Sequence, residues 1–263
     1  MIVVKIGGAE GNDLHRFVND IPRDESIIIV HGGSDEMNSL SLRLDHSPVF
    51  ITSPSGHTSR FTDRDTLDLI TMSYSGRINK GLVELLRRNG HNALGLTGLD
   101  GGLLRGSRKS TVRSVENGRV KILRGDNTGK VESVNTRLLE IILEEGYLPV
   151  ITIPIEAEDG GPLNADCDRV AAAVASSMKA DRLILLTNQP GLLRDPADPG
   201  SLVGSIRQGE IENAMKFARG RMKKKILAAQ EAVQGGVREV VISSSMIDRP
   251  IDSAMSGSGT VIS

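Results

Sequence analysis

The chain has 263 residues, of which 32 are Lys or Arg and 33 are Asp or Glu, so its net charge is −1. With 2% aromatic residues and no tryptophan, it offers neither the positive field nor the stacking platform typical of nucleic-acid-binding proteins. The single cysteine, Cys167, excludes an internal disulfide, and we expect it to be a small buried residue. Because no apolar run approaches about 18 residues and a strand begins at residue 2, we expect a cytoplasmic protein without a membrane anchor.

Two strands of the buried type run directly into paired glycines. Residues 2–6 contain Lys5 and lead into Gly7-Gly8, and residues 27–30 lead into His31-Gly32-Gly33. Glycine pairs at strand ends let backbone amides approach an anion closely. Either pair alone is more typical of a tight strand-to-helix turn. The two pairs together, with a lysine at the same place, predict a cradle for phosphate.

Apolar runs of strand type alternate with helical patterns along the chain. This alternation predicts an α/β fold, a three-layer αβα sandwich around a central, mainly parallel sheet, with ligands beyond the carboxyl ends of the strands. The expected strands are residues 2–6, 27–30, 93–97, 148–153, 183–187 and 238–242, and the expected helices are residues 63–88, 135–145, 168–178 and 221–233.

Three segments interrupt the alternation. Residues 110–123 predict a β-hairpin turned at Asn117-Gly118, a shorter hairpin is expected around residues 49–51, and residues 156–163 are rich in loop formers. We expect these insertions to cover one side of the cleft. Because no linker or repeat appears, we predict a single domain with an N-terminal lobe of about residues 1–165 and a C-terminal lobe of about residues 166–263.

Two later segments carry charges suited to a phosphate site. In Asn164-Ala165-Asp166-Cys167-Asp168, either aspartate is also a candidate helix cap. The segment from Arg219 to Lys225 carries five positive charges in seven positions. Near the start of a helix such charge opposes the helix dipole unless an anion binds there, which favours a phosphate partner over a merely solvated face. By contrast, residues 125–131 lack the spacing of a P-loop.

Several ordered motifs resemble the amino acid kinase family, and in particular its acetylglutamate kinase branch. Within that branch, the chain is most similar to kinases that act on aminoadipate or glutamate conjugated to an amino-group carrier protein, LysW. The motifs are residues 4–8, 30–33, 59–62, 98–102, 164–168, 185–187, 222–225 and 248–251.

The resemblance implies a phosphotransferase of amino-acid biosynthesis, in the lysine or arginine pathway, that uses MgATP and makes an acyl phosphate. Lys5 and Lys225 would flank the transferred phosphate and Asp168 would organise them, with no metal ligand from protein side chains. The N-terminal lobe would take the acid and the C-terminal lobe the nucleotide. The implied phosphate-binding residues are Gly7, Gly8, Gly32 and Gly33, the substrate-binding residues are Arg60 and Asn164, and the nucleotide side comprises Thr187, Asn188 and Met222.

Three residues depart from the family pattern. Ser34 replaces a common third glycine, Asn188 replaces an aspartate, and Arg221 replaces a glycine before Met222, where we expect it to add bulk at a turn near the nucleotide. The chain also begins in its first strand, without the N-terminal helix associated with arginine-sensitive hexamers. We therefore expect an uninhibited homodimer.

A basic segment offers a hypothesis for the acceptor. Such a segment is usually a solvated face, yet on a near-neutral protein it suits docking of an acidic carrier protein. Plain N-acetylglutamate kinase remains an alternative, as does an inactive nucleotide or amino-acid sensor. The basic residues are Arg105, Arg108, Lys109, Arg113, Arg119, Lys121 and Arg124.

Overall fold

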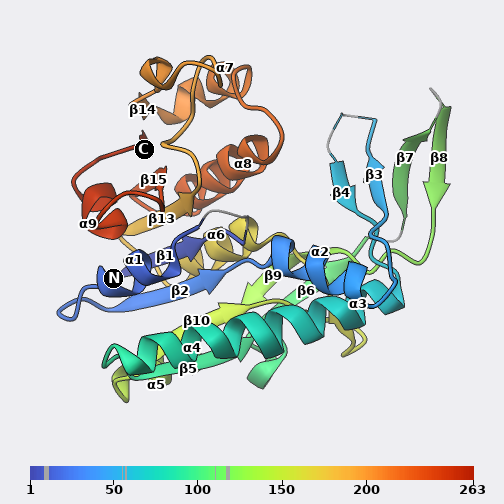
Figure 1. The fold of residues 1–263 in the computed structure, drawn as a ribbon, viewed down its shortest axis with the longest axis horizontal. Coiled ribbons are helices and arrows are strands. Elements are labelled where there is room, and N and C mark those ends of the chain that lie inside the picture. Colours follow the sequence, from blue (N-terminus) through green and yellow to red (C-terminus); the bar gives the residue numbers. More distant parts are fainter. Residues whose placement is uncertain (9–11, 55, 57, 110, 117–118) are drawn as a thin grey trace.

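The computed structural model describes residues 1–8, 12–54, 56, 58–109, 111–116 and 119–263. Within this part of the chain, eight strands form one sheet in the order β14-β16-β15-β13-β1-β2-β10-β5 (Figure 1). Paired strands from β15 to β5 run parallel, whereas β16 is antiparallel to β15. The predicted α/β fold with a mainly parallel sheet is confirmed. In sheet order, the strands are Ser205–Ile206, Thr260–Ile262, Glu239–Ser244, Arg182–Thr187, Ile2–Ile6, Ile27–His31, Leu148–Thr152 and Ala93–Thr97.

Strand β1 lies in the middle of this sheet and is buried on both faces. Val3 belongs to one apolar cluster, whereas Val4 and Ile6 belong to another on the opposite face. Because side chains alternate along a strand, Lys5 lies on the same face as Val3. Strand β1 pairs with β2 on one side and with β13 on the other, so one sheet runs through both expected lobes. The lobe boundary itself stays a prediction.

Helices cover both faces of the sheet. The cluster around Val3 includes residues of α2, α3, α5, α6, α7 and α8, and the cluster around Val4 includes residues of α1, α4 and α9. This arrangement gives the three layers that the alternating pattern predicted. The helices are α1 (Leu14–Asn19), α2 (Ser34–Arg43), α3 (Arg64–Ile70), α4 (Asn79–Arg88), α5 (Thr136–Glu144), α6 (Cys167–Ser177), α7 (Ile211–Met215), α8 (Arg221–Gln234) and α9 (Pro250–Met255), with short 3-10 turns at Asp100–Gly102, Pro199–Ser201 and Gln208–Glu210.

The helix expected over residues 63–88 is helical throughout but not a single α-helix. Helix α3 passes directly into the π-helix Thr71–Ile78 (η1), which passes into α4. Asp63 caps the start of α3 by accepting a hydrogen bond from the Thr66 amide. A π-helix widens the turn and changes which side chains face the protein interior, and such turns are frequent at functional sites.

Smaller sheets hold the insertions. The expected hairpins form as the pairs β3–β4 and β7–β8, while the turn at Asn117-Gly118 lies outside the described residues. The two hairpins contact each other and project from one end of the molecule (Figure 1). A four-stranded sheet, β12-β11-β6-β9, was not predicted. These strands are β3 (Phe50–Thr52), β4 (Thr58–Arg60), β6 (Leu104–Arg108), β7 (Val112–Glu116), β8 (Arg119–Leu123), β9 (Gly129–Val134), β11 (Ile155–Ala157) and β12 (Pro162–Leu163).

Candidate active site

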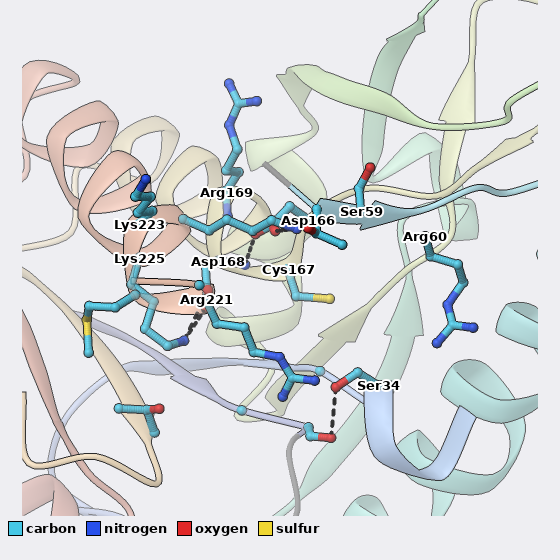
Figure 2. Close-up of a pocket in the computed structure, with 18 of the residues that line it drawn as sticks. Ser34, Ser59, Arg60, Asp166, Cys167, Asp168, Arg169, Arg221, Lys223 and Lys225 are labelled. Carbon is cyan, nitrogen blue, oxygen red and sulfur yellow. Dashed lines mark hydrogen bonds and ion pairs between the residues drawn. The ribbon is translucent and has the colours of Figure 1, made fainter. Parts of the chain in front are cut away.

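Three charged side chains from β1, α6 and α8 meet in the interior. Lys5 Nζ lies 2.7 Å from Asp168 Oδ1, and Lys225 Nζ lies 3.0 Å from both carboxylate oxygens of Asp168. All three side chains are buried, and Figure 2 shows Lys225 and Asp168 facing each other. The structure thus brings together the three residues that the resemblance marked as catalytic.

This cluster holds two ammonium groups and one carboxylate. Burial alone would raise the pKa of Asp168, but Lys225 and Lys5 hold it well below its usual range. Burial opposes the charge on Lys5 too, yet contact with Asp168 raises the pKa of Lys5. For Lys225, burial and the charge of Lys5 lower the pKa. When all three are ionised the cluster carries one surplus positive charge, which an anion can neutralise.

The two aspartates before α6 have different partners. Asp166 is the helix cap, because its Oδ1 accepts hydrogen bonds from the amides of Asp168 at 3.0 Å and Arg169 at 3.3 Å. The capping role that the sequence left open between them therefore falls to Asp166. This leaves the Asp168 carboxylate directed at the two lysines.

The two glycine pairs follow β1 and β2 and lie against each other. A Cβ on Gly8 would lie 2.0 Å from the Gly33 nitrogen, and a Cβ on Gly33 would lie 2.2 Å from Ile78 Cδ1. Neither position has room for a side chain, so the two backbone turns approach as closely as glycine allows. Gly33 is also the N-cap of α2, where free amides and the helix dipole favour an anion.

Ser34, which replaces the common third glycine, links the two loops. Its Oγ donates a hydrogen bond to the Gly8 carbonyl at 3.2 Å (Figure 2). The Asp35 amide donates to the same oxygen at 2.9 Å. The substitution at this position therefore adds a contact between the loops.

A cavity of about 860 Å³ contains the charged cluster and both glycine pairs. Arg60 and Asn164 line it, as do Thr187, Asn188 and Met222. The predicted acid side and the predicted nucleotide side therefore open into one space. Strand β4 contributes to its wall as expected of an insertion, whereas no described residue of β7 or β8 does.

Arg60 is held in place at one end of this cavity. Its guanidinium carbon lies 5.0 Å from the centre of the Phe50 ring, and Nη2 donates a hydrogen bond to Asn38 Oδ1. Its Nη1 is buried and has no hydrogen-bond partner within the described part of the chain. An oxygen of a bound carboxylate would satisfy this nitrogen. Asn164 donates from Nδ2 to the Thr62 hydroxyl at 2.9 Å.

The expected nucleotide side lies where β13 ends and α8 begins. Thr187 is the last residue of β13, Asn188 follows it, and Met222 lies in the first turn of α8. The tight turn before α8 is made by Gly220, whose φ is 49°, and Arg221 is the first helical residue. Our expectation that Arg221 adds bulk at a turn is therefore wrong, because glycine occupies the position with positive φ. Figure 2 shows the Arg221 side chain reaching across the cavity towards Ser34.

Several residues of the cavity were missed by sequence reasoning, and one was assigned differently. Cys167, expected to be a small buried residue, is half-buried and lines the cavity, and Figure 2 shows its sulfur directed towards the side of Arg60. Burial raises the pKa of the Cys167 thiol to about 12, so it stays protonated. Asn38, Phe50 and Tyr74 also line the cavity, and no motif in the sequence singled them out.

Five of the seven basic residues expected to dock a carrier lie on strands of two different sheets. Arg105 and Arg108 lie on β6 and form ion pairs with Glu156 at 3.1 Å and Asp159 at 3.5 Å. Lys109 lines the cavity. The remaining residues lie on or beside the β7–β8 hairpin, which also exposes Val120 and Ile122. They are Arg113, Arg119, Lys121 and Arg124.

No group of three or more His, Cys, Asp or Glu side chains within the described ranges is arranged to hold a metal ion. Among the helices of the described chain, none is long and apolar enough to cross a membrane.

Residues 1–244 match the amino acid kinase family. The chain belongs to this family. The expected fold class and the family resemblance are thereby confirmed.

Relatives extend over the whole chain. It is 52% identical to a Deinococcus radiodurans protein named LysW-aminoadipate kinase, covering 100% of this chain and 91% of that protein. It is 47% identical to a Thermus thermophilus protein of the same name, covering 100% of both. A Saccharolobus solfataricus protein named LysW-aminoadipate/LysW-glutamate kinase is 37% identical over 100% of this chain and 99% of its own length.

Solved structures share the fold. N-acetylglutamate synthase from Neisseria gonorrhoeae matches with a TM-score of 0.79 at 22% identity, over 100% of this chain and 59% of that one. Carbamate kinase from Giardia lamblia matches with a TM-score of 0.69 at 13% identity, over 99% of this chain and 97% of that one. At these identities, the likeness concerns the fold alone.

Proposed function

We propose that the protein transfers the γ-phosphoryl group of ATP to the side-chain carboxylate of aminoadipate or glutamate, carried by an acidic amino-group carrier protein. The observation that carries this proposal is the buried cluster of Lys5, Asp168 and Lys225, which has a surplus positive charge and lies beside two glycine loops. The names of full-length relatives at 37–52% identity support the acceptor and the carrier.

The chemistry needs charge stabilisation and alignment. An oxygen of the acceptor carboxylate attacks the γ-phosphorus, and the bond from that phosphorus to the bridging oxygen breaks with its electron pair leaving on ADP. Because the carboxylate is already ionised, no general base is required. Negative charge spreads over the phosphoryl oxygens during transfer and must be met by cations and amides.

The described residues fit these tasks. Lys5 and Lys225 would contact the transferred phosphoryl group, Asp168 would fix their positions, and the amides of Gly8 and Gly33 would donate to its oxygens. Arg60, whose Nη1 has no hydrogen-bond partner among the described residues, and Asn164 would hold the α-carboxylate end of the acid. Thr187, Asn188 and Met222 would contact the nucleotide. Mg²⁺, held by the ATP phosphates, would supply further positive charge.

Carrier docking and assembly extend the proposal. We assign docking of the acidic carrier to the basic β7–β8 hairpin, where exposed charges can steer association. Assembly as a homodimer remains a prediction from the family resemblance, and a cytoplasmic location remains a prediction from the sequence composition. Sedimentation of the purified protein tests whether it is a homodimer.

Hydroxylamine trapping of the acyl phosphate tests the function. The protein, ATP and hydroxylamine are incubated with carrier-linked aminoadipate, carrier-linked glutamate or free N-acetylglutamate. We expect hydroxamate from the carrier-linked acids and little from N-acetylglutamate. Hydroxamate from N-acetylglutamate alone would favour the N-acetylglutamate kinase alternative. Nucleotide binding without hydroxamate from any acid would favour the inactive sensor.

A further inference from the structure

Tyr74 is a buried residue of the π-helix whose side chain lines the cavity. Its ring packs against the second glycine loop, since a Cβ on Gly33 would lie 3.2 Å from Tyr74 Cε2 and 3.3 Å from Cδ2. The loop expected to bind phosphoryl oxygens is therefore backed by an aromatic ring. Neither the glycine motif nor the charged cluster accounts for a tyrosine at this position.

The Tyr74 hydroxyl lies near groups from both ends of the expected acid site. The guanidinium of Arg60, the thiol of Cys167 and the backbone N–H of Gly33 all affect the pKa of Tyr74, and all three residues line the same cavity as its side chain. Arg60 is the expected anchor of the α-carboxylate, Cys167 precedes Asp168, and Gly33 belongs to the phosphate loop. An acid that extends from Arg60 to the charged cluster would share the cavity with this hydroxyl.

The hydroxyl has a free proton to donate. Arg60 and the Gly33 amide are hydrogen-bond donors, so neither can accept the proton of the phenol. Within the described part of the chain, the hydroxyl donates to no other residue. Burial raises the pKa of Tyr74 well above its ordinary value, so the group stays a donor at every working pH. An ionised carboxylate, which only accepts hydrogen bonds, is its natural complement.

We propose that the Tyr74 hydroxyl donates a hydrogen bond to the reacting side-chain carboxylate of the acid, at the oxygen that does not attack phosphorus. This assignment rests on the proposed function. The Gly33 amide beside the hydroxyl belongs to the phosphate cradle, which places the contact at the reacting end of the acid. Held in this way, the second oxygen is directed at the γ-phosphorus, and the bonded oxygen becomes the carbonyl oxygen of the acyl phosphate.

The test uses the two tyrosines of the chain as a matched pair. Tyr74→Phe keeps the ring and removes only the hydroxyl, whereas Tyr147→Phe makes the same change at an exposed position before β10. We expect Tyr74→Phe to lower kcat for acyl phosphate formation about 10- to 100-fold, the range of a hydrogen bond to a charged group, with the KM for ATP unchanged. Tyr147→Phe should leave both constants unchanged. A Tyr74→Phe protein with unchanged kcat, or with a raised acid KM alone, overturns the assignment.

A second measurement leaves Tyr74 intact. The chain has no tryptophan and two tyrosines, so in the Tyr147→Phe protein every ultraviolet tyrosine signal comes from Tyr74. Titration with N-acetyl-2-aminoadipate in the presence of ADP should change the tyrosine absorbance saturably, and the Tyr74→Phe protein should give no such change. A flat titration of the Tyr147→Phe protein overturns the proposal. If the unsubstituted protein makes no acyl phosphate from any acid, the proposed function fails, and this titration still decides whether Tyr74 contacts the acid.

Discussion

Lys225 donates to both carboxylate oxygens of Asp168, with its Nζ at 3.0 Å from each. Lys5, on strand β1, lies with its Nζ 2.7 Å from Oδ1 of the same carboxylate. One carboxylate therefore holds two buried ammonium groups, and its loss would leave both without a charged partner in the cluster. The geometry explains why an aspartate in the first turn of α6 matters to residues at both ends of the chain.

Replacing Asp168 by asparagine should destabilise the protein. The change leaves two buried lysines without their carboxylate, and breaking a buried ion pair in this way costs about 3–5 kcal/mol. Chemical denaturation measures the free energy of unfolding. Asp166→Asn is the control, because asparagine also caps helices and should cost less than about 1 kcal/mol. Equal stability of the two variants would refute the role given to Asp168.

Gly8→Ala should strongly reduce activity through a change in the backbone. Its Cβ would lie 2.0 Å from the Gly33 nitrogen, so the two loops must separate. We expect kcat/KM for ATP to fall at least about 100-fold, since positioned backbone donors to a phosphoryl group are worth that much. Gly81→Ala, in α4 with nothing within 4 Å of the new Cβ, should be harmless. Normal kinetics of Gly8→Ala would show that close approach of the loops is not required.

Reversing charge on the β7–β8 hairpin should weaken carrier docking alone. With Arg113, Arg119 and Lys121 changed to glutamate, we expect the KM for the carrier conjugate to rise at least about 10-fold, because electrostatic steering is lost. The effect should shrink at high salt. The matched control reverses Arg87, Arg88 and Arg238, which are exposed elsewhere. Steady-state kinetics with a free N-acyl acid should not change in either protein, and an unaltered KM for the conjugate would contradict docking at the hairpin.

The buried side chain of His31 should make the stability of the protein depend on pH. Burial lowers its pKa from 6.5 to about 4, and its Nε2 accepts a hydrogen bond from Asn79 Nδ2 at 3.0 Å, a contact that needs the neutral ring. The unfolded chain therefore binds a proton between pH 6.5 and 4 that the folded protein does not. The contribution of the neutral His31 to the free energy of unfolding is full above pH 6.5 and falls by about 3 kcal/mol as the pH drops to 4. Denaturation at several pH values measures this slope, and His31→Gln should flatten it; an equal slope would contradict the assignment.

The sheet and its glycine loops were predictable because their signals are local. An unbroken apolar run such as residues 2–6 can hardly be anything but a buried strand, and Gly7-Gly8 marks its end. The contact between Asp168 and the lysines was expected only through the family resemblance. Residues separated by 57 positions, as Asp168 and Lys225 are, leave no mark of their proximity in one sequence.

The parts that escaped prediction depend on tertiary packing. Tyr74 lines the cavity from a π-helix, and no residue pattern in the sequence predicts a π-helix. The sequence grouped Arg105 and Arg108 with the basic residues of the hairpin. In the structure they lie on β6, where they form ion pairs with Glu156 and Asp159 from the segment after β10. Phe50 and Asn38 orient Arg60 from separate elements.

The proposed mechanism depends above all on Lys225 stabilising the phosphoryl group during its transfer. The test measures the kcat of Lys225→Ala for hydroxamate formation from carrier-linked aminoadipate. The control variant is Lys216→Ala. Lys216 is exposed, lies outside the cavity and donates a hydrogen bond to Asn213. We predict a loss of at least about 100-fold in kcat with little change in the KM for either substrate, and no loss in Lys216→Ala. A Lys225→Ala protein that folds and keeps near-normal kcat would contradict the central claim.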